Sequence, residues 1–298
     1  MERKTHMDAF GAAALIAFAL HLAFNQVVIK VTNEGFNPVF AAGARSAGAV
    51  LVLLLWMWLR GIPVGIPRAA WGAGLAAGVL FALEFFCLFL ALDLTSVSRA
   101  SVIFYSMPVW LALAAHFLLP GEQVSGLRGL GLFLAMAGVA LALSDRSGAA
   151  VSWAGDLLAL AAALCWAAIA LSVRLTRLVT IPPAQQLICQ VGVSAPLLLL
   201  AAPAFGPLLR EVEVIHVAAL GFQTVAVASL GFLAWFWLMT IYPAASVASF
   251  SFLSPVFSVL LGWLLLSENV APSVWAALVL VAAGIYLINR RPRVAAAG

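Results

Sequence analysis

The stretch that decides the fold is SMPVWLALAAHFLLPGEQV at residues 106–124, because a second version, LSPVFSVLLGWLLLSENV, occupies residues 253–270. Each copy has a proline among apolar residues and then a glutamate, Glu122 or Glu268, where the apolar run breaks. In each copy a glycine, Gly138 or Gly284, follows the glutamate by sixteen residues. A motif that recurs in this order predicts that the chain is an internal duplication.

The beginnings of the two halves also match. The run ALHL at residues 19–22, which leads to Lys30, corresponds to ALCW at residues 163–166, which leads to Arg174. The repeat is therefore about 145 residues long. It divides the chain into a first unit and a second unit, expected at residues 8–145 and 152–291.

The composition excludes a water-soluble fold. Of the 298 residues, 65% are hydrophobic and 9% are charged, whereas soluble domains have about 45–50% apolar and about 25% charged residues. Runs of about 20 apolar residues, which cross the hydrocarbon as a helix, recur along the sequence. We expect an all-α membrane protein with ten spans, near residues 9–30, 37–59, 70–92, 97–119, 126–143, 155–173, 183–205, 214–239, 244–266 and 272–289.

The number of spans in each repeat sets the expected symmetry. Five is an odd number, so the second repeat is inserted upside down relative to the first. Inverted repeats around a central cavity are common in secondary transporters, because they give two related states that face opposite sides of the membrane. We expect this architecture here, with a monomer as the working unit.

Basic residues set the expected orientation. Cytoplasmic loops are enriched in Lys and Arg, and ten of the fifteen basic residues fall on the side of the N-terminus. These ten are Arg3, Lys4, Arg60, Arg68, Arg128, Arg174, Arg177, Arg290, Arg291 and Arg293. Both termini are therefore expected in the cytoplasm. The net charge of +4 does not indicate nucleic-acid binding, since basic residues lie singly or in pairs between apolar runs.

With two five-helix halves and a doubled Pro-to-Glu-to-Gly pattern, the chain resembles the EamA-type members of the drug/metabolite transporter superfamily over residues 8–290. Within that group it looks most like bacterial amino-acid exporters, including those for aromatic amino acids. The resemblance implies an exporter in the bacterial inner (plasma) membrane. The sequence departs from the family pattern at Leu22, where members often have tryptophan, and at Ile169, which lacks the amide of its counterpart Asn25.

Two charged residues fall deep within predicted spans. A charge near the bilayer centre costs about 2.5–3.5 kcal/mol, so such residues usually face a cavity or a partner. Arg45 and Glu84 lie at matching depths in the second and third spans and can form a buried ion pair. The pair can simply lock two helices together. Alternatively, Arg45 binds a substrate carboxylate, and Glu84 binds an ammonium group or carries a proton.

Further polar residues are candidates for the same cavity. His21 and Asn25 share one helical stripe, and they either line the cavity or hydrogen-bond a neighbouring helix. Under the repeat alignment Arg45 lies opposite Gln190, and His21 lies beside the position of Trp166. The remaining candidates, Tyr105 and Gln223, either contact substrate or bond to a backbone carbonyl.

Pro108 and Pro255 occupy matching positions within predicted spans. Proline removes a hydrogen-bond donor and bends a helix. The two residues are predicted to be hinges that rock each half, or else static kinks.

Other functions fit the sequence less well. It has no HExxH motif, no aspartate-rich metal pair and no suggestive Ser/His/Asp set, so an enzyme is not expected. The three cysteines lack metal-ligand spacing and no phosphate-binding loop occurs, so neither metal nor cofactor is expected. We predict export of amino acids or related metabolites from the cytoplasm by alternating access, with Glu84 as the candidate proton carrier. Export of other drugs or metabolites and a channel-like facilitator remain the alternatives.

Overall fold

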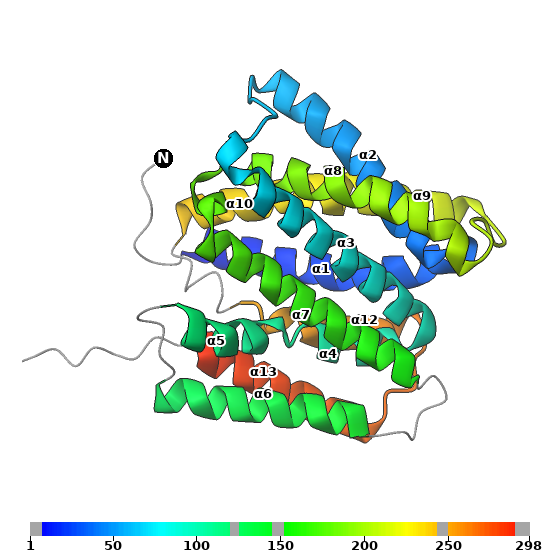
Figure 1. Ribbon diagram of the computed structural model, residues 1–298. Coiled ribbons are helices and arrows are strands. Elements are labelled where there is room, and N and C mark those ends of the chain that lie inside the picture. The colour runs from blue at the N-terminus through cyan, green and yellow to red at the C-terminus, as the bar shows by residue number, and fades with distance from the viewer. Residues whose placement is uncertain (1–7, 120–124, 145–151, 243–249, 290–298) are drawn as a thin grey trace, which may run out of the picture.

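The computed structural model describes residues 8–119, 125–144, 152–242 and 250–289. Within them the chain is a bundle of helices (Figure 1). The first repeat contains α1 (Ala9–Gly35), α2 (Pro38–Leu59), α3 (Trp71–Leu94), α4 (Val97–Phe104), α5 (Met107–Leu118) and α6 (Gly126–Ser144). The second contains α7 (Trp153–Leu175), α8 (Pro183–Ala201), α9 (Val214–Phe222), a π-helix (Gln223–Gly231), α10 (Phe232–Ile241), α12 (Leu253–Leu265) and α13 (Pro272–Asn289).

The predicted spans agree with this bundle. Nine helical stretches of the described chain are long and apolar enough to cross a membrane. At the position of the ninth predicted span the described residues form a shorter apolar helix, α12. The first part of that span, residues 243–249, lies outside the described residues. The protein is thus an all-α integral membrane protein.

The two repeats run in opposite directions. The start of α1 and the end of α13 lie at the left of Figure 1, which we call the terminal end; the opposite end is the distal end. Helix α1 runs from the terminal to the distal end, whereas its counterpart α7 runs back from the distal end. A hydrogen bond of 2.7 Å from Tyr242 Oη to Asp8 Oδ1 places the end of α10 at the terminal end as well.

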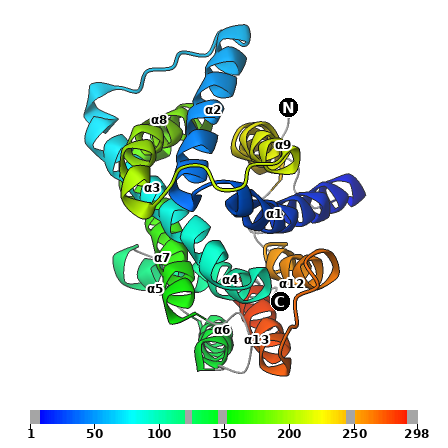
Figure 2. The same cartoon turned by 90° about the vertical axis from the view of Figure 1, so that its right-hand side faces the viewer.

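The main helix pairs join one repeat to the other. Helix α6 packs along α13, α3 along α7 and α2 along α8. Figure 2 faces the distal end and shows α6 and α13 side by side at one edge of the bundle. A small residue allows the first of these contacts, since a Cβ atom on Gly284 would lie 2.5 Å from the carbonyl oxygen of Gly131.

Both prolines of the repeated motif lie where a helix begins. The predicted span 97–119 is divided into α4 and α5, and Pro108 is in the first turn of α5. Pro255 is likewise in the first turn of α12, after a turn at residues 250–252. The missing donor of a proline is tolerated at this position, because first-turn amides have no partner within the helix. At Pro108 the expected bend is therefore a break between α4 and α5, and at Pro255 a helix begins after a turn.

Candidate functional site

Arg45 is a buried arginine in the second span. It lies on α2, and its side chain is 1% exposed. Its guanidinium carbon is 3.7 Å from the centre of the Phe85 ring and 5.2 Å from that of Phe89, both on α3. Within the described chain, none of its three side-chain nitrogens makes a hydrogen bond. The rings stabilise the positive charge, but the donors are unused.

The ion pair expected between Arg45 and Glu84 is absent from the described residues. Glu84 is 4% exposed and interacts with Arg45 electrostatically, without direct contact. The helix geometry gives the reason. Phe85 and Phe89 share the face of α3 that meets Arg45, and Glu84 points about 100° away around the helix. Glu84 is also close enough to Cys165 on α7 to interact with it electrostatically.

His21 contacts the π-helix. Its Nε2 atom is 3.1 Å from the carbonyl oxygen of Ala226, and its ring lies 5.5 Å from that of Phe222. The interpretation as a bond between helices therefore fits His21. The same side chain also borders a groove of about 390 Å³ between α1 and the helices of the second repeat. Side chains around that groove are otherwise apolar or aromatic, including Phe18 and Trp237.

Two candidate residues, Tyr105 and Trp166, meet where α4 ends. Gln26 on α1 donates a hydrogen bond of 3.3 Å from Nε2 to Tyr105 Oη, and Tyr105 Oη donates to the carbonyl oxygen of Leu22, also at 3.3 Å. The ring of Trp166 on α7 lies 6.3 Å from that of Tyr105. Asn25, next to Gln26, is buried. Its Oδ1 atom and Gln26 Oε1 have no hydrogen-bond partner among the described residues.

The two remaining candidates lie elsewhere. Gln223 is fully buried and donates a hydrogen bond of 2.6 Å to Thr32 Oγ1, near the distal end of α1. Gln190 is half-buried on α8, the helix that packs along both α2 and α3. The structure thus places Arg45 and Glu84 on adjoining helices and joins Tyr105, Trp166 and Gln26. It separates these groups from Gln223.

The π-helix was not predicted from the sequence. Residues 223–231 form it, and Ser229 Oγ donates a hydrogen bond of 2.8 Å to the carbonyl oxygen of Thr224, five residues earlier. A π-helical segment inside an α-helix is rare and frequently marks a functional site. Apolar periodicity does not distinguish the π-helix from the α-helices on either side, so the sequence analysis could not detect it.

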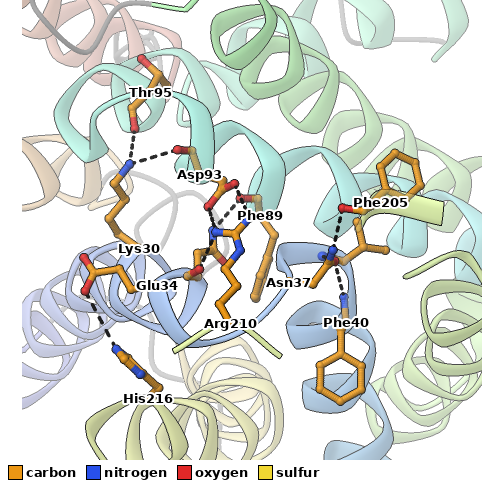
Figure 3. Close-up of polar contacts among 12 residues, drawn as sticks. Lys30, Glu34, Asn37, Phe40, Phe89, Asp93, Thr95, Phe205, Arg210 and His216 are labelled. Atoms are coloured by element: carbon orange, nitrogen blue, oxygen red, sulfur yellow. Dashed lines mark hydrogen bonds and ion pairs between the residues drawn. The ribbon is translucent and has the colours of Figure 1, made fainter. Parts of the chain in front are cut away.

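The polar network at the distal end was also missed (Figure 3). Arg210, between α8 and α9, binds both oxygens of Asp93 on α3, at 2.8 and 3.0 Å. Its Nη1 atom also donates to the carbonyl oxygen of Asn33 at 2.7 Å. Lys30 donates to the carbonyl oxygens of Asp93 and Thr95, at 3.4 and 3.0 Å. One arginine of the second repeat therefore joins the ends of α1 and α3.

Backbone contacts extend this network. The Arg210 amide donates to the Gly35 carbonyl oxygen at 2.9 Å, and the Asn37 amide donates to that of Leu208 at 3.0 Å. Hydrogen bonds with Asp93 raise the pKa of the Arg210 guanidinium. Single Lys, Asp and Arg residues at the ends of spans give no sequence signal for such contacts, because each partner lies far away in the chain.

Two further acidic residues hold α4 at its distal start. Glu268, of the repeated motif, accepts hydrogen bonds from the amides of Val97 and Ser98 at 2.6 and 2.9 Å. Asp156 of α7 forms a bidentate pair with Arg99 at 2.7 and 2.9 Å, in which both side chains are buried. The carboxylate of Glu268 fits there because the first amides of a helix lack internal partners and favour negative charge. Its counterpart Glu122 lies outside the described residues.

Comparison with known protein families identifies the same two repeats. The model of the EamA-like transporter family matches the chain twice, over residues 9–144 and 153–290. The chain belongs to the EamA-like transporter family.

Two of the similar proteins are named as transporters. An uncharacterized transporter of Synechocystis is 26% identical over 98% of this chain and 93% of that protein. An uncharacterized transporter of Bacillus subtilis is 26% identical, over 94% of this chain and 92% of the relative. A chloroplastic WAT1-related protein of Arabidopsis thaliana is 30% identical over 88% of this chain and 65% of its own length. A solved crystal structure superposes with a TM-score of 0.64 at 22% identity, covering 93% of this chain and 96% of that one, which shows the fold.

Membership of the EamA family gives the buried polar groups a context. The protein is a membrane transporter of small molecules, so groups that face its interior can bind a cargo. Arg45 has the strongest unmet requirement, because a guanidinium carries five N–H donors and the described chain supplies no acceptor to them. Chemically, this arrangement fits an anionic group better than a neutral one.

Proposed function

We propose that this EamA-family transporter exports amino acids or related small metabolites from the cytoplasm by alternating access. The observation that carries the proposal is the buried guanidinium of Arg45, whose three nitrogens make no hydrogen bond within the described residues. Burial of a charge without a hydrogen-bonded partner costs on the order of several kcal/mol. Such a residue is explained by a partner that is present for part of the cycle, and a carboxylate supplies two acceptors in the matching geometry.

Neighbouring groups favour a zwitterion. Glu84 lies buried on the adjoining helix without an ion-pair contact to Arg45, so both side chains are available to a substrate. The buried oxygens Asn25 Oδ1 and Gln26 Oε1 also lack donors in the described part of the chain. A substrate ammonium group carries three N–H donors, which suit a carboxylate and neutral oxygens of this kind. We assign substrate contact to these residues and to His21, Tyr105, Trp166, Gln190 and Gln223.

Charge distribution supports the proposed orientation of the chain in the membrane. The described residues at the terminal end include five arginines, whereas the distal end has three basic residues, Lys30, Arg99 and Arg210. The positive-inside rule then puts the terminal end, and both termini, in the cytoplasm of a bacterial inner membrane. The five arginines are Arg60, Arg68, Arg128, Arg174 and Arg177.

Alternating access requires parts that move. The breaks before Pro108 and Pro255 leave short helical segments at matching places in the two repeats. Helices that are interrupted within the membrane supply hinges and exposed carbonyl groups in transporters. We propose that these two prolines mark the hinges and that one polypeptide carries out the whole cycle.

The test is efflux of preloaded radiolabelled amino acids from proteoliposomes, for the native protein, Arg45→Lys and the matched control Arg60→Lys. Arg60 lies at the terminal end of α2 and is exposed. Lysine keeps the charge but loses the bidentate fork, so we expect Arg45→Lys to lower the rate about tenfold or more for carboxylate substrates, and less for amines without a carboxylate. Equal losses for both substrate types would refute carboxylate binding by Arg45. Efflux of no amino acid would exclude the proposed substrate class.

A further inference from the structure

In the distal network, one side chain of the second repeat binds two helix ends of the first repeat. Asp93 ends α3 in the first repeat, and Arg210 lies between α8 and α9 in the second. The same guanidinium binds the carbonyl oxygen of Asn33 at the end of α1. Separation of the two repeats at this end therefore requires Arg210 to leave both partners.

From this geometry we infer that the Asp93–Arg210 pair is a releasable latch, which closes the distal end of the transporter and opens once in each transport cycle. The inference rests on the proposed alternating access. It adds a specific gate, formed by two residues that do not contact the candidate substrate site.

The internal repeat provides a comparison within the same molecule. Under the repeat alignment, position 93 falls at residues 238–240, which read Leu-Met-Thr and contain no carboxylate. At the terminal end the corresponding loops meet through Gln185, which donates to the carbonyl oxygens of Pro63 and Gly65 at 2.7 and 3.0 Å. An ion pair at the position of the latch therefore has no counterpart at the terminal end, so its effect is to favour closure at the distal end only.

Burial decides which distal contact is able to open. The side chains of Arg210 and Asp93 are 39% and 21% exposed, so water and salt screen their attraction. Such a pair changes an equilibrium by about two- to fivefold. The Arg99–Asp156 pair is 3% and 0% exposed and is far more costly to break. We therefore expect the start of α4 to stay attached to α7 while the latch opens.

The first experiment fixes the latch in its closed state. In full-length protein with Cys87, Cys165 and Cys189 replaced by alanine, Asp93→Cys and Arg210→Cys are joined by a short bis-methanethiosulfonate reagent. We expect transport to fall at least about tenfold and to return after reduction with dithiothreitol, while each single-cysteine variant is unaffected by the reagent. Transport that continues in the cross-linked protein would overturn the proposal.

The second experiment keeps Asp93 and Arg210 and requires no substrate. Spin labels at Leu94→Cys and Val212→Cys, both exposed at the distal end, report the separation of α3 from the α8–α9 connection by pulsed electron paramagnetic resonance. We expect two separations, with the longer one enriched about two- to fivefold by Arg210→Gln and restored by the charge exchange Asp93→Arg with Arg210→Asp. One separation that Arg210→Gln leaves unchanged would refute the latch. Two separations without transport would instead refute the proposed function and retain the latch.

Discussion

At the scale of residues, Arg45 and Arg99 form a natural comparison. Both are buried arginines, at 1% and 3% exposure, but Arg99 has a bidentate carboxylate partner and Arg45 lies on aromatic rings. Removal of one member of a buried pair leaves an uncompensated charge, whereas removal of an unpaired charge relieves one. The two residues should therefore respond in opposite ways to the same substitution.

We predict that Arg99→Met lowers the free energy of unfolding by about 3–5 kcal/mol, because it leaves Asp156 charged and buried. Arg45→Met should keep the stability within about 1 kcal/mol of the native protein, or raise it, while it abolishes carboxylate transport. Thermal unfolding in detergent and proteoliposome efflux measure the two effects. A loss of stability as large for Arg45→Met as for Arg99→Met would indicate that Arg45 is structural.

Glu84 is the residue to test for proton coupling. It is buried in the membrane, whereas Glu34 at the distal end is 65% exposed. If Glu84 carries the proton, Glu84→Gln should fold normally and make the transport rate independent of an imposed pH gradient. Glu34→Gln should retain the pH dependence of the native protein. A pH dependence that Glu84→Gln does not change would remove protons from the mechanism.

The positions of Arg45 and Glu84 deep within predicted spans indicated that both residues are buried, and the structure agrees. Their pairing was wrong, because equal depth does not fix the rotation of a helix about its axis. Phe85 takes the face toward Arg45 that the sequence analysis gave to Glu84. Tyr105 and Trp166 are far apart in the sequence but are neighbours in the structure, since α4 ends against both α1 and α7.

At the scale of elements, the broken helices differ from the expected ones. The prolines were predicted to bend continuous spans, but each begins a helical segment. At the break before Pro108, Ser106 Oγ donates to the carbonyl oxygen of Ile103 at 2.6 Å, so a side chain replaces a lost helical hydrogen bond. A single serine before a proline carries no sequence signal that separates a kink from a break.

The close contact of α6 with α13 gives a prediction for an element. A Cβ atom on Gly284 would lie 2.5 Å from the Gly131 carbonyl oxygen, whereas one on Gly72 meets nothing within 4 Å. We expect Gly284→Ala to lower the stability by about 1–3 kcal/mol, because the helices must separate. Gly72→Ala should be neutral or slightly stabilising, since alanine favours helix. Thermal unfolding of the two variants checks this, and equal melting temperatures would contradict the contact.

At the scale of the whole molecule, the repeated motif predicted the architecture. An odd number of spans in each repeat implies that the second repeat is inverted, and α1 and α7 indeed run in opposite directions. The contacts that join the repeats could not be predicted, because Arg210 and Asp93 are far apart in the chain and neither belongs to the repeated motif. Glu268 does belong to it, and its position against α4 gives the motif a structural role that spacing did not reveal.

Counterflow in proteoliposomes distinguishes an alternating-access carrier from a channel. Vesicles that contain unlabelled substrate are diluted into a trace of the labelled substrate. A carrier moves the labelled molecule into the vesicle against its own gradient. We therefore expect a transient accumulation above equilibrium, which is lost in the cross-linked Asp93→Cys/Arg210→Cys protein. Uptake that rises only to equilibrium, with no overshoot, would contradict alternating access and identify a channel-like facilitator.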